Sequence, residues 1–253
     1  MFFLNSHKII NLIVLLLIII LIEGLLCRPI LGLYLYEPYK FCSNYFFLHF
    51  WEENGFVEIL QSLFLFFAII YLIKARTHFK DIKLINFFLI TKIIVLTYYL
   101  GEEISWGQHF FNWTSPDWFL INNNQNETNI HNISNIFDQL PRTLVLIWCS
   151  LSVPLILCIN NISQINKSIF KIFCPDKKLL LISILLLLLV LPDLIIDKFN
   201  LHPGFVDEIG KPIESAYFYT MISLNFLRLS ELHEFIFASY FLFYSWSFKN
   251  STN

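Results

Sequence analysis

The residues LINFFLITKIIVLTYYLGEEISWGQH, numbered 84–109, decide the fold class. Residues 84–100 are apolar apart from Asn86, two threonines and Lys92, and a helix needs about 20 such residues to cross the hydrocarbon core of a bilayer. The span runs directly into Gly101, Glu102 and Glu103. Ionisable groups are expensive to place at the end of a membrane segment, so we expect these to have a function.

Similar apolar blocks recur along the chain. Of the 253 residues, 57% are hydrophobic and 14% are charged, against about 25% charged in an average soluble domain. The predicted spans are residues 9–27, 56–73, 84–100, 143–159, 179–196 and 232–248. The sequence therefore predicts an all-α fold: a polytopic transmembrane helical bundle of about six spans, forming a single integral membrane domain over residues 1–253, with interfacial helices on its outer face.

Two connectors are rich in aromatic or turn-forming residues. The aromatic side chains of residues 28–54 favour the headgroup level, so we expect this connector to lie along the interface. Residues 215–227 form either an interfacial helix or the beginning of the last span, which would then run to Phe248.

The distribution of basic residues predicts the orientation. Lysine and arginine gather in the second connector (Lys74, Arg76, Lys80, Lys83) and the fourth (Lys167, Lys171, Lys177, Lys178), and none precedes Pro141 in the third. By the positive-inside rule, both termini and these basic connectors are cytoplasmic. The net charge of −2 gives no indication of a nucleic-acid partner. The partners expected are the lipid bilayer and a lipid or amphipathic small molecule.

This orientation places most ionisable residues on the outer side. A transporter needs polar groups through both leaflets, whereas the cytoplasmic halves of the spans carry few polar groups beyond Asn86 and Lys92. The pattern favours an enzyme or receptor at the outer leaflet. The outer set is Glu52, Glu53, Glu58, Glu102, Glu103, His109, Glu127, His131, Asp193, Asp197, His202, Asp207, Glu208, Glu231, His233 and Glu234.

A metal site is one prediction for the central motif, GEEISWGQHFFNWTSPDWFLINNNQNETNIH at residues 101–131. Helical spacing would place Glu102, Ser105, Trp106 and His109 on one face, and Glu127 and His131 on another if residues 126–135 are helical. Mixed oxygen and nitrogen ligands suit a divalent metal such as Zn, Fe or Mn. The predicted ligands are Glu102, His109, Glu127 and His131, with Glu103 or His202 as the general base.

Further residues are predicted to contribute to binding: Glu58, Ser105, Trp106, Gln108, Arg228 and Glu231. Lys92 must reach the interface or meet a carboxylate, and Glu58 is a candidate partner. The alternative for the whole motif is a structural role. Glu102 and Glu103 would then be solvated or hydrogen-bonded to nearby indoles, and Trp106, Trp113 and Trp118 would be interfacial anchors.

Three segments carry a resemblance to a known family. The motifs EENGFVE (52–58), GEEISWGQ (101–108) and NETNIHN (126–132) resemble a family of uncharacterised bacterial multi-span membrane proteins. This resemblance implies a protein integral to the bacterial inner membrane, and the orientation predicted from the basic residues then puts the motif loops on the periplasmic side. It implies no particular activity.

Three functions are therefore expected from the sequence. The first is an outward-facing, metal-assisted hydrolase or transferase acting on a lipid-linked or amphipathic substrate. The second is a non-catalytic membrane binding or assembly protein whose outer face holds a partner. The third, ranked last, is a proton-coupled transporter using Glu58, Lys92 and Glu102.

Overall fold

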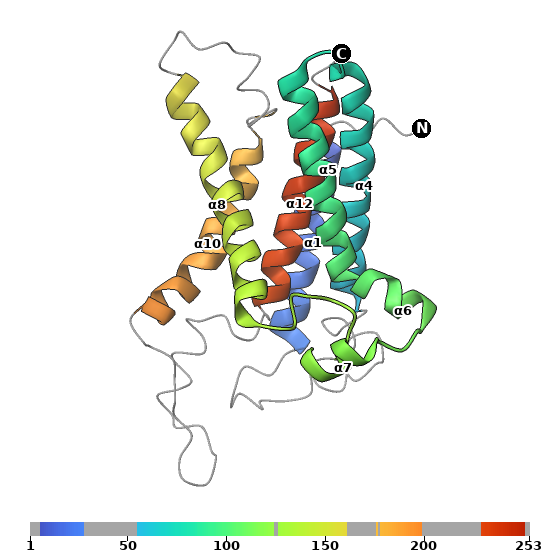
Figure 1. Ribbon diagram of the computed structural model, residues 1–253. Helices are drawn as coiled ribbons and strands as arrows, with labels where there is room; N and C mark the ends of the chain where they lie inside the picture. Colours follow the sequence, from blue (N-terminus) through green and yellow to red (C-terminus); the bar gives the residue numbers. More distant parts are fainter. Residues whose placement is uncertain are drawn as a thin grey trace. The chain divides into compact units, whose positions relative to one another are not determined.

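The computed structural model describes residues 6–27, 55–123, 126–160, 176, 178–198 and 229–250. Every regular element in these ranges is a helix (Figure 1). The elements are α1 (Ser6–Cys27), α4 (Phe56–Phe79), α5 (Lys83–Glu103), the 3₁₀ turn η1 (Ser105–Gly107), α6 (Gln108–Phe111), α7 (Asp117–Asn122), α8 (Asn135–Asn160), α10 (Leu179–Lys198) and α12 (Leu229–Asn250). The all-α prediction is confirmed, and each of the six predicted spans falls within a helix. The predicted interfacial segments 28–54 and 215–227 lie outside the described residues.

Two of the described helices, α4 and α5, are long and apolar enough to cross a membrane. Only 33% and 22% of their apolar windows are buried, so neither resembles the core helix of a soluble domain. Their exposed positions carry large apolar side chains, among them Phe66, Phe87 and Ile94. A surface of this kind requires an apolar covering.

Helix boundaries differ from the sequence prediction at both ends of the central region. The predicted basic loop at residues 74–83 is largely helical, because α4 continues through Lys74 and Arg76 to Phe79. Lysine, alanine and arginine favour helix, and they extend α4 until the short turn before α5. Helix α8 begins at Asn135, before the predicted residue 143, and it includes the exposed apolar residues Ile136 and Phe137.

The chain divides into two compact units. The first comprises Met1–Glu58 and Leu185–Ile236, and the second Ile59–Ile184 and Phe237–Asn253. In the first unit, α1 buries Ile9, Ile13, Leu17 and Ile20, which recur at the helical period and so form one stripe along the helix.

Helix α12 supplies much of the core of the second unit. Its residues from Phe237 to Phe248 are all buried. A T-shaped contact joins the rings of Phe248 and Phe79 of α4, with centroids 5.3 Å apart. Helices α4 and α5 are joined near their shared turn by a 2.9 Å hydrogen bond from Nε of Arg76 to Oδ1 of Asn86. On α8, the carbonyl of Cys149 accepts a hydrogen bond from the Ser183 hydroxyl of α10.

Candidate functional site

The end of α5 is fixed by a run of left-handed residues. Ser105, Trp106 and Gly107 have φ values of 45°, 55° and 96°. Left-handed backbone costs a non-glycine residue roughly 1–2 kcal/mol, so Ser105 and Trp106 hold this conformation only because surrounding contacts stabilise it. The run separates α5, which ends at Glu103, from α6, which begins at Gln108.

The carboxylate of Glu102 is the first of these contacts. Its Oε2 accepts hydrogen bonds from the backbone N–H of Ile130 at 2.6 Å and of His131 at 3.0 Å. Its Oε1 accepts the indole N–H of Trp106 at 2.9 Å. The Nδ1 of His131 lies 3.4 Å from Oε2, and the side chain of Glu102 is only 5% exposed. A buried carboxylate in this position binds the loop at residues 130–131 to the end of α5.

A second carboxylate, that of Glu127, stabilises the left-handed run itself. Its Oε2 accepts the Ser105 hydroxyl at 2.7 Å and the Asn129 amide at 2.6 Å. The Asn129 amide also lies 3.0 Å from the Ser105 oxygen. Asn123 completes the arrangement, since its amide donates to the backbone oxygen and to Oδ1 of Asn129, both at 2.8 Å. Ser105, Asn123, Glu127 and Asn129 are all buried.

Gln108 makes a third connection between the two motifs. Its Oε1 accepts the backbone N–H of Thr128 at 2.7 Å and lies 3.0 Å from the Ser115 hydroxyl. Ser115 is buried, and its oxygen is also 2.7 Å from the carbonyl oxygen of Asn126 and 3.1 Å from the hydroxyl of Thr128. We call the joined side chains the polar network: Glu102, Ser105, Gln108, Ser115, Asn123, Glu127, Thr128 and Asn129.

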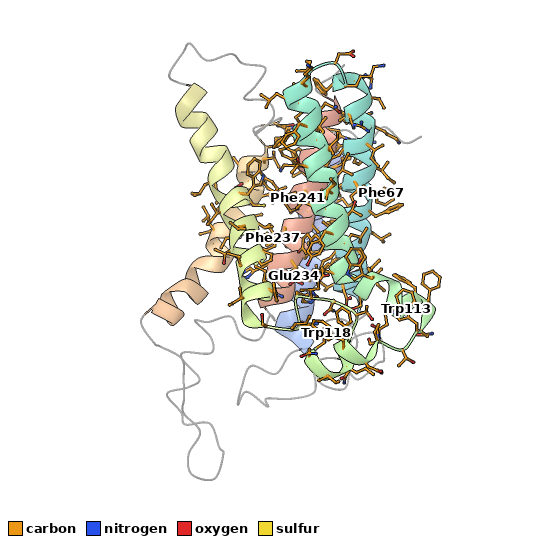
Figure 2. The ribbon with its side chains drawn as sticks, viewed as in Figure 1. Phe67, Trp113, Trp118, Glu234, Phe237 and Phe241 are labelled. Atoms are coloured by element: carbon orange, nitrogen blue, oxygen red, sulfur yellow. The ribbon has the colours of Figure 1, made fainter. Side chains whose placement is uncertain are left out.

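An aromatic surface surrounds the polar network. A Cβ built at Gly101 would lie 2.9 Å from ring atoms of Trp106, so this glycine allows the indole to lie against α5. The rings of Phe111 and Trp113 stack with centroids 5.8 Å apart, and both approach Gly107. We call the exposed side chains of this segment the aromatic fringe: Trp106, Phe110, Phe111, Trp113, Trp118 and the neighbouring Ile121. Figure 2 shows Trp113 and Trp118 on the segment that contains α6 and α7.

The structure brings several of the predicted site residues together. Glu102 meets Trp106 and His131, and Ser105 meets Glu127. The predicted helical framework is wrong, however. The left-handed residues end the helix before Trp106, and residues 126–134 form bends and turns rather than a helix.

Other predicted residues lie elsewhere. Glu103 is half-buried at the end of α5, and Glu58 belongs to the other compact unit. The side chains of His109 and Glu231 lie outside the described part of the structure, as do His202 and Arg228 entirely.

The carboxylates of Glu102 and Glu127 are arranged as hydrogen-bond acceptors rather than as metal ligands. Among the described side chains, no three His, Cys, Asp or Glu residues lie close enough together to hold a metal ion. Both oxygens of Glu102 accept N–H donors, and Oε2 of Glu127 accepts a hydroxyl and an amide. A metal bound to Oε2 of either carboxylate would have to displace these donors and leave them unpaired in a buried place. Glu102, Glu127 and His131 therefore form no metal site among the described side chains, and the metal stays a prediction because the side chain of the fourth predicted ligand, His109, lies outside them.

Sequence reasoning missed four members of the network: Ser115, Asn123, Thr128 and Asn129. Asn123 and Asn129 lie in a stretch rich in asparagine. Because asparagine is frequent in this chain, its presence there did not indicate a site. One signal was present, because Glu127, Asn129 and His131 alternate along the chain. Alternating residues of an extended strand or loop face the same side, whereas residues four apart do so only in a helix.

Comparison with known proteins adds no family to this geometry. No protein-family model, no curated protein and no solved structure matches the chain. The class that the described residues define is a helical protein in which two of the described helices are long and apolar enough to cross a membrane.

Proposed function

We propose that the protein is a non-catalytic polytopic membrane protein of about six spans that binds lipid at its outer face. Both termini are cytoplasmic in this proposal. The polar network and the aromatic fringe together form a rigid platform at the headgroup level, and the fringe side chains contact the lipid.

The observation that carries the proposal is the contrast between the network and the fringe. The carboxylates of Glu102 and Glu127 are turned inward and accept hydrogen bonds from their own chain. Most of the large side chains left exposed are rings, with Phe111 at 76% and Trp118 at 57% exposure, beside smaller polar residues such as Asn112. Indole and phenyl rings beside the end of an apolar helix favour the membrane interface.

The charge of the segment supports lipid as the occupant. Between Ile104 and Asn123 the ionisable side chains are those of His109 and Asp117. A surface rich in exposed rings and this poor in charge is unfavourable in water but matches the boundary between headgroups and acyl chains. The exposed hydroxyls of Thr91 and Thr97 on α5 donate to the carbonyls of Phe87 and Ile93, which would satisfy them where no water is present.

Bromine quenching of tryptophan fluorescence tests the platform. Variants that retain only Trp113 or only Trp118 are placed in vesicles of phosphatidylcholine brominated near the headgroup or near the chain end. Headgroup-proximal bromine should quench both more strongly than deep bromine. A variant retaining only Trp148, in the middle of α8, is the matched control and should show the reverse order. Quenching of Trp113 and Trp118 by aqueous iodide, without quenching by either lipid, would contradict the proposal.

A second measurement separates binding from catalysis. Labelled phosphatidylcholine incubated with the reconstituted protein should be recovered unchanged, and metal analysis of the purified protein should find no stoichiometric metal. Lipid turnover that stops in Glu102→Gln would favour the metal-assisted hydrolase or transferase instead.

A further inference from the structure

A cavity of about 240 Å³ lies within the second unit, between α5, α8 and α12. Its walls are aromatic and aliphatic side chains, with Thr91 and Lys92 of α5 among them. The Thr91 hydroxyl donates to the carbonyl of Phe87 in its own helix, so it is already paired. Lys92 is the charged group of the cavity wall.

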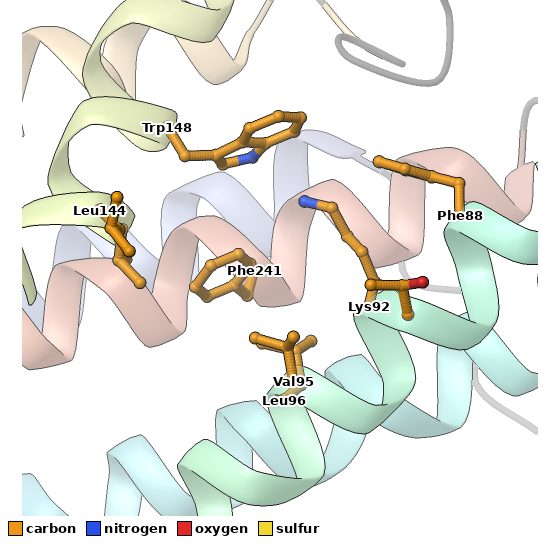
Figure 3. A pocket seen from close by; sticks show the side chains of 9 residues that line it. Phe88, Lys92, Val95, Leu96, Leu144, Trp148 and Phe241 are labelled. Carbon is orange, nitrogen blue, oxygen red and sulfur yellow. The ribbon is translucent and has the colours of Figure 1, made fainter. Parts of the chain in front are cut away.

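Aromatic rings surround the Lys92 ammonium. Its Nζ lies 4.0 Å from the ring centroid of Trp148 and 4.4 Å from that of Tyr244. The rings of Phe88 and Phe241 are at 5.3 Å and 5.5 Å. Figure 3 shows the ammonium extending from α5 toward the indole of Trp148. Ring faces attract a cation, and this arrangement holds the charge in place.

Ring faces do not supply the negative charge that a buried ammonium favours. Within the described part of the chain, no ion pair joins Lys92 to a carboxylate. The contacts of Lys92 do not include the predicted pairing with Glu58. The Lys92 side chain lies among the rings instead. A cation in an apolar wall is stabilised most by an anion brought to it in the same low-dielectric place.

We propose that this cavity binds a single-chain amphipathic carboxylate, with the carboxylate paired to Lys92 and the hydrocarbon tail lying along the apolar wall. The site is independent of the outer platform. A cavity of about 150 Å³ holds benzene, so this larger cavity accommodates several methylene groups of a tail. Val95 and Leu144, which line it, are 51% and 59% exposed, so the tail has an open path to the surroundings.

Equilibrium binding of laurate and dodecanol tests the site, because the two probes share a chain length and differ in the carboxylate. Protein in nanodiscs of neutral lipid is compared with empty nanodiscs. Wild-type protein should bind laurate at least about tenfold more tightly than dodecanol, since a charge-assisted hydrogen bond is the stronger kind.

Substitutions at Lys92 and a distant lysine make the test specific. Lys92→Met keeps the length of the side chain and removes a charge from the cavity wall, so we expect the variant to fold and the preference for laurate to disappear. Lys92→Arg should retain it. Lys80→Met, which removes an exposed lysine outside the cavity, should also retain it. Val95→Phe, which narrows the cavity and keeps Lys92, should weaken the binding of both probes.

Three results would overturn the proposal. They are equal binding of the two probes by wild-type protein, no binding of either probe above empty nanodiscs, and a preference for laurate that persists in Lys92→Met.

Discussion

Removal of the Glu102 carboxylate should release the loop that it binds. In Glu102→Ala, the backbone N–H groups of Ile130 and His131 and the indole N–H of Trp106 lose their acceptor. An unpaired buried donor costs about 1–3 kcal/mol, and we use the lower half of that range because both amides are half-buried. Two amides at about 1.5 kcal/mol each give a loss of about 3 kcal/mol.

Hydrogen–deuterium exchange measures this loss at the amides themselves. At about 1.4 kcal/mol per factor of ten, exchange at Ile130 and His131 should rise about 100-fold in Glu102→Ala. Glu102→Gln keeps one oxygen for the two amides but loses its charge and turns an amide N–H toward Trp106, so we expect a rise of about tenfold. Asp117→Asn, which removes an exposed carboxylate from the same segment, should change nothing.

The outcome that would refute the reasoning is equally specific. If exchange at Ile130 and His131 rose by less than about threefold in Glu102→Ala, the carboxylate would not be stabilising the loop. An equal rise in Asp117→Asn would mean that general charge, rather than the hydrogen bonds of Glu102, sets the protection.

Three further substitutions test the neighbouring contacts. Ser105→Ala removes the hydroxyl that Glu127 accepts, and it should lower the free energy of unfolding by about 1–3 kcal/mol in detergent. Gly101→Ala places a Cβ at 2.9 Å from the Trp106 ring, so the indole must leave its hydrogen bond, and the fluorescence of a variant with Trp106 as its single tryptophan should shift to longer wavelength. Gly107→Ala puts a side chain on backbone with φ of 96°, which should cost about 1–2 kcal/mol in denaturant titrations; an unchanged midpoint would mean that the turn relaxes freely.

The helices were predictable because apolar blocks of membrane length are a strong signal. The ends of the helices were less predictable. Helix α4, for example, continues through Lys74 and Arg76. The prediction that this basic stretch is a loop assumed that charged residues end a helix. The long aliphatic stems of lysine and arginine are compatible with a helix, however.

The sequence singled out several residues that the structure brings together, but the helical geometry expected for them was wrong. Glu102 and His131 were predicted to belong to one site, and their side chains do lie next to each other. The spacing argument failed because Ser105 and Trp106 adopt left-handed backbone, which is unusual for both residue types. Only tertiary contacts, here the acceptance of the Ser105 hydroxyl by Glu127, stabilise such a conformation. No local pattern encodes them.

Lys92 shows a further limit of the sequence. A lysine in the middle of an apolar segment predicts a carboxylate partner or a path to the interface. Of the four rings that surround it, that of Phe88 belongs to α5, and the other three come from α8 and α12, far along the chain. Aromatic residues are so frequent in this sequence that those four could not be singled out in advance.

The short connection between α4 and α5 has a consequence for biosynthesis. Residues 80–82 alone separate the two helices, and the bond from Arg76 to Asn86 closes their turn. Three extended residues reach about 10 Å, far less than the roughly 30 Å of a hydrocarbon core, so the turn cannot cross a bilayer. We therefore expect the two helices to pass through the bilayer in opposite directions, so that the orientation taken by α4 during synthesis also sets that of α5.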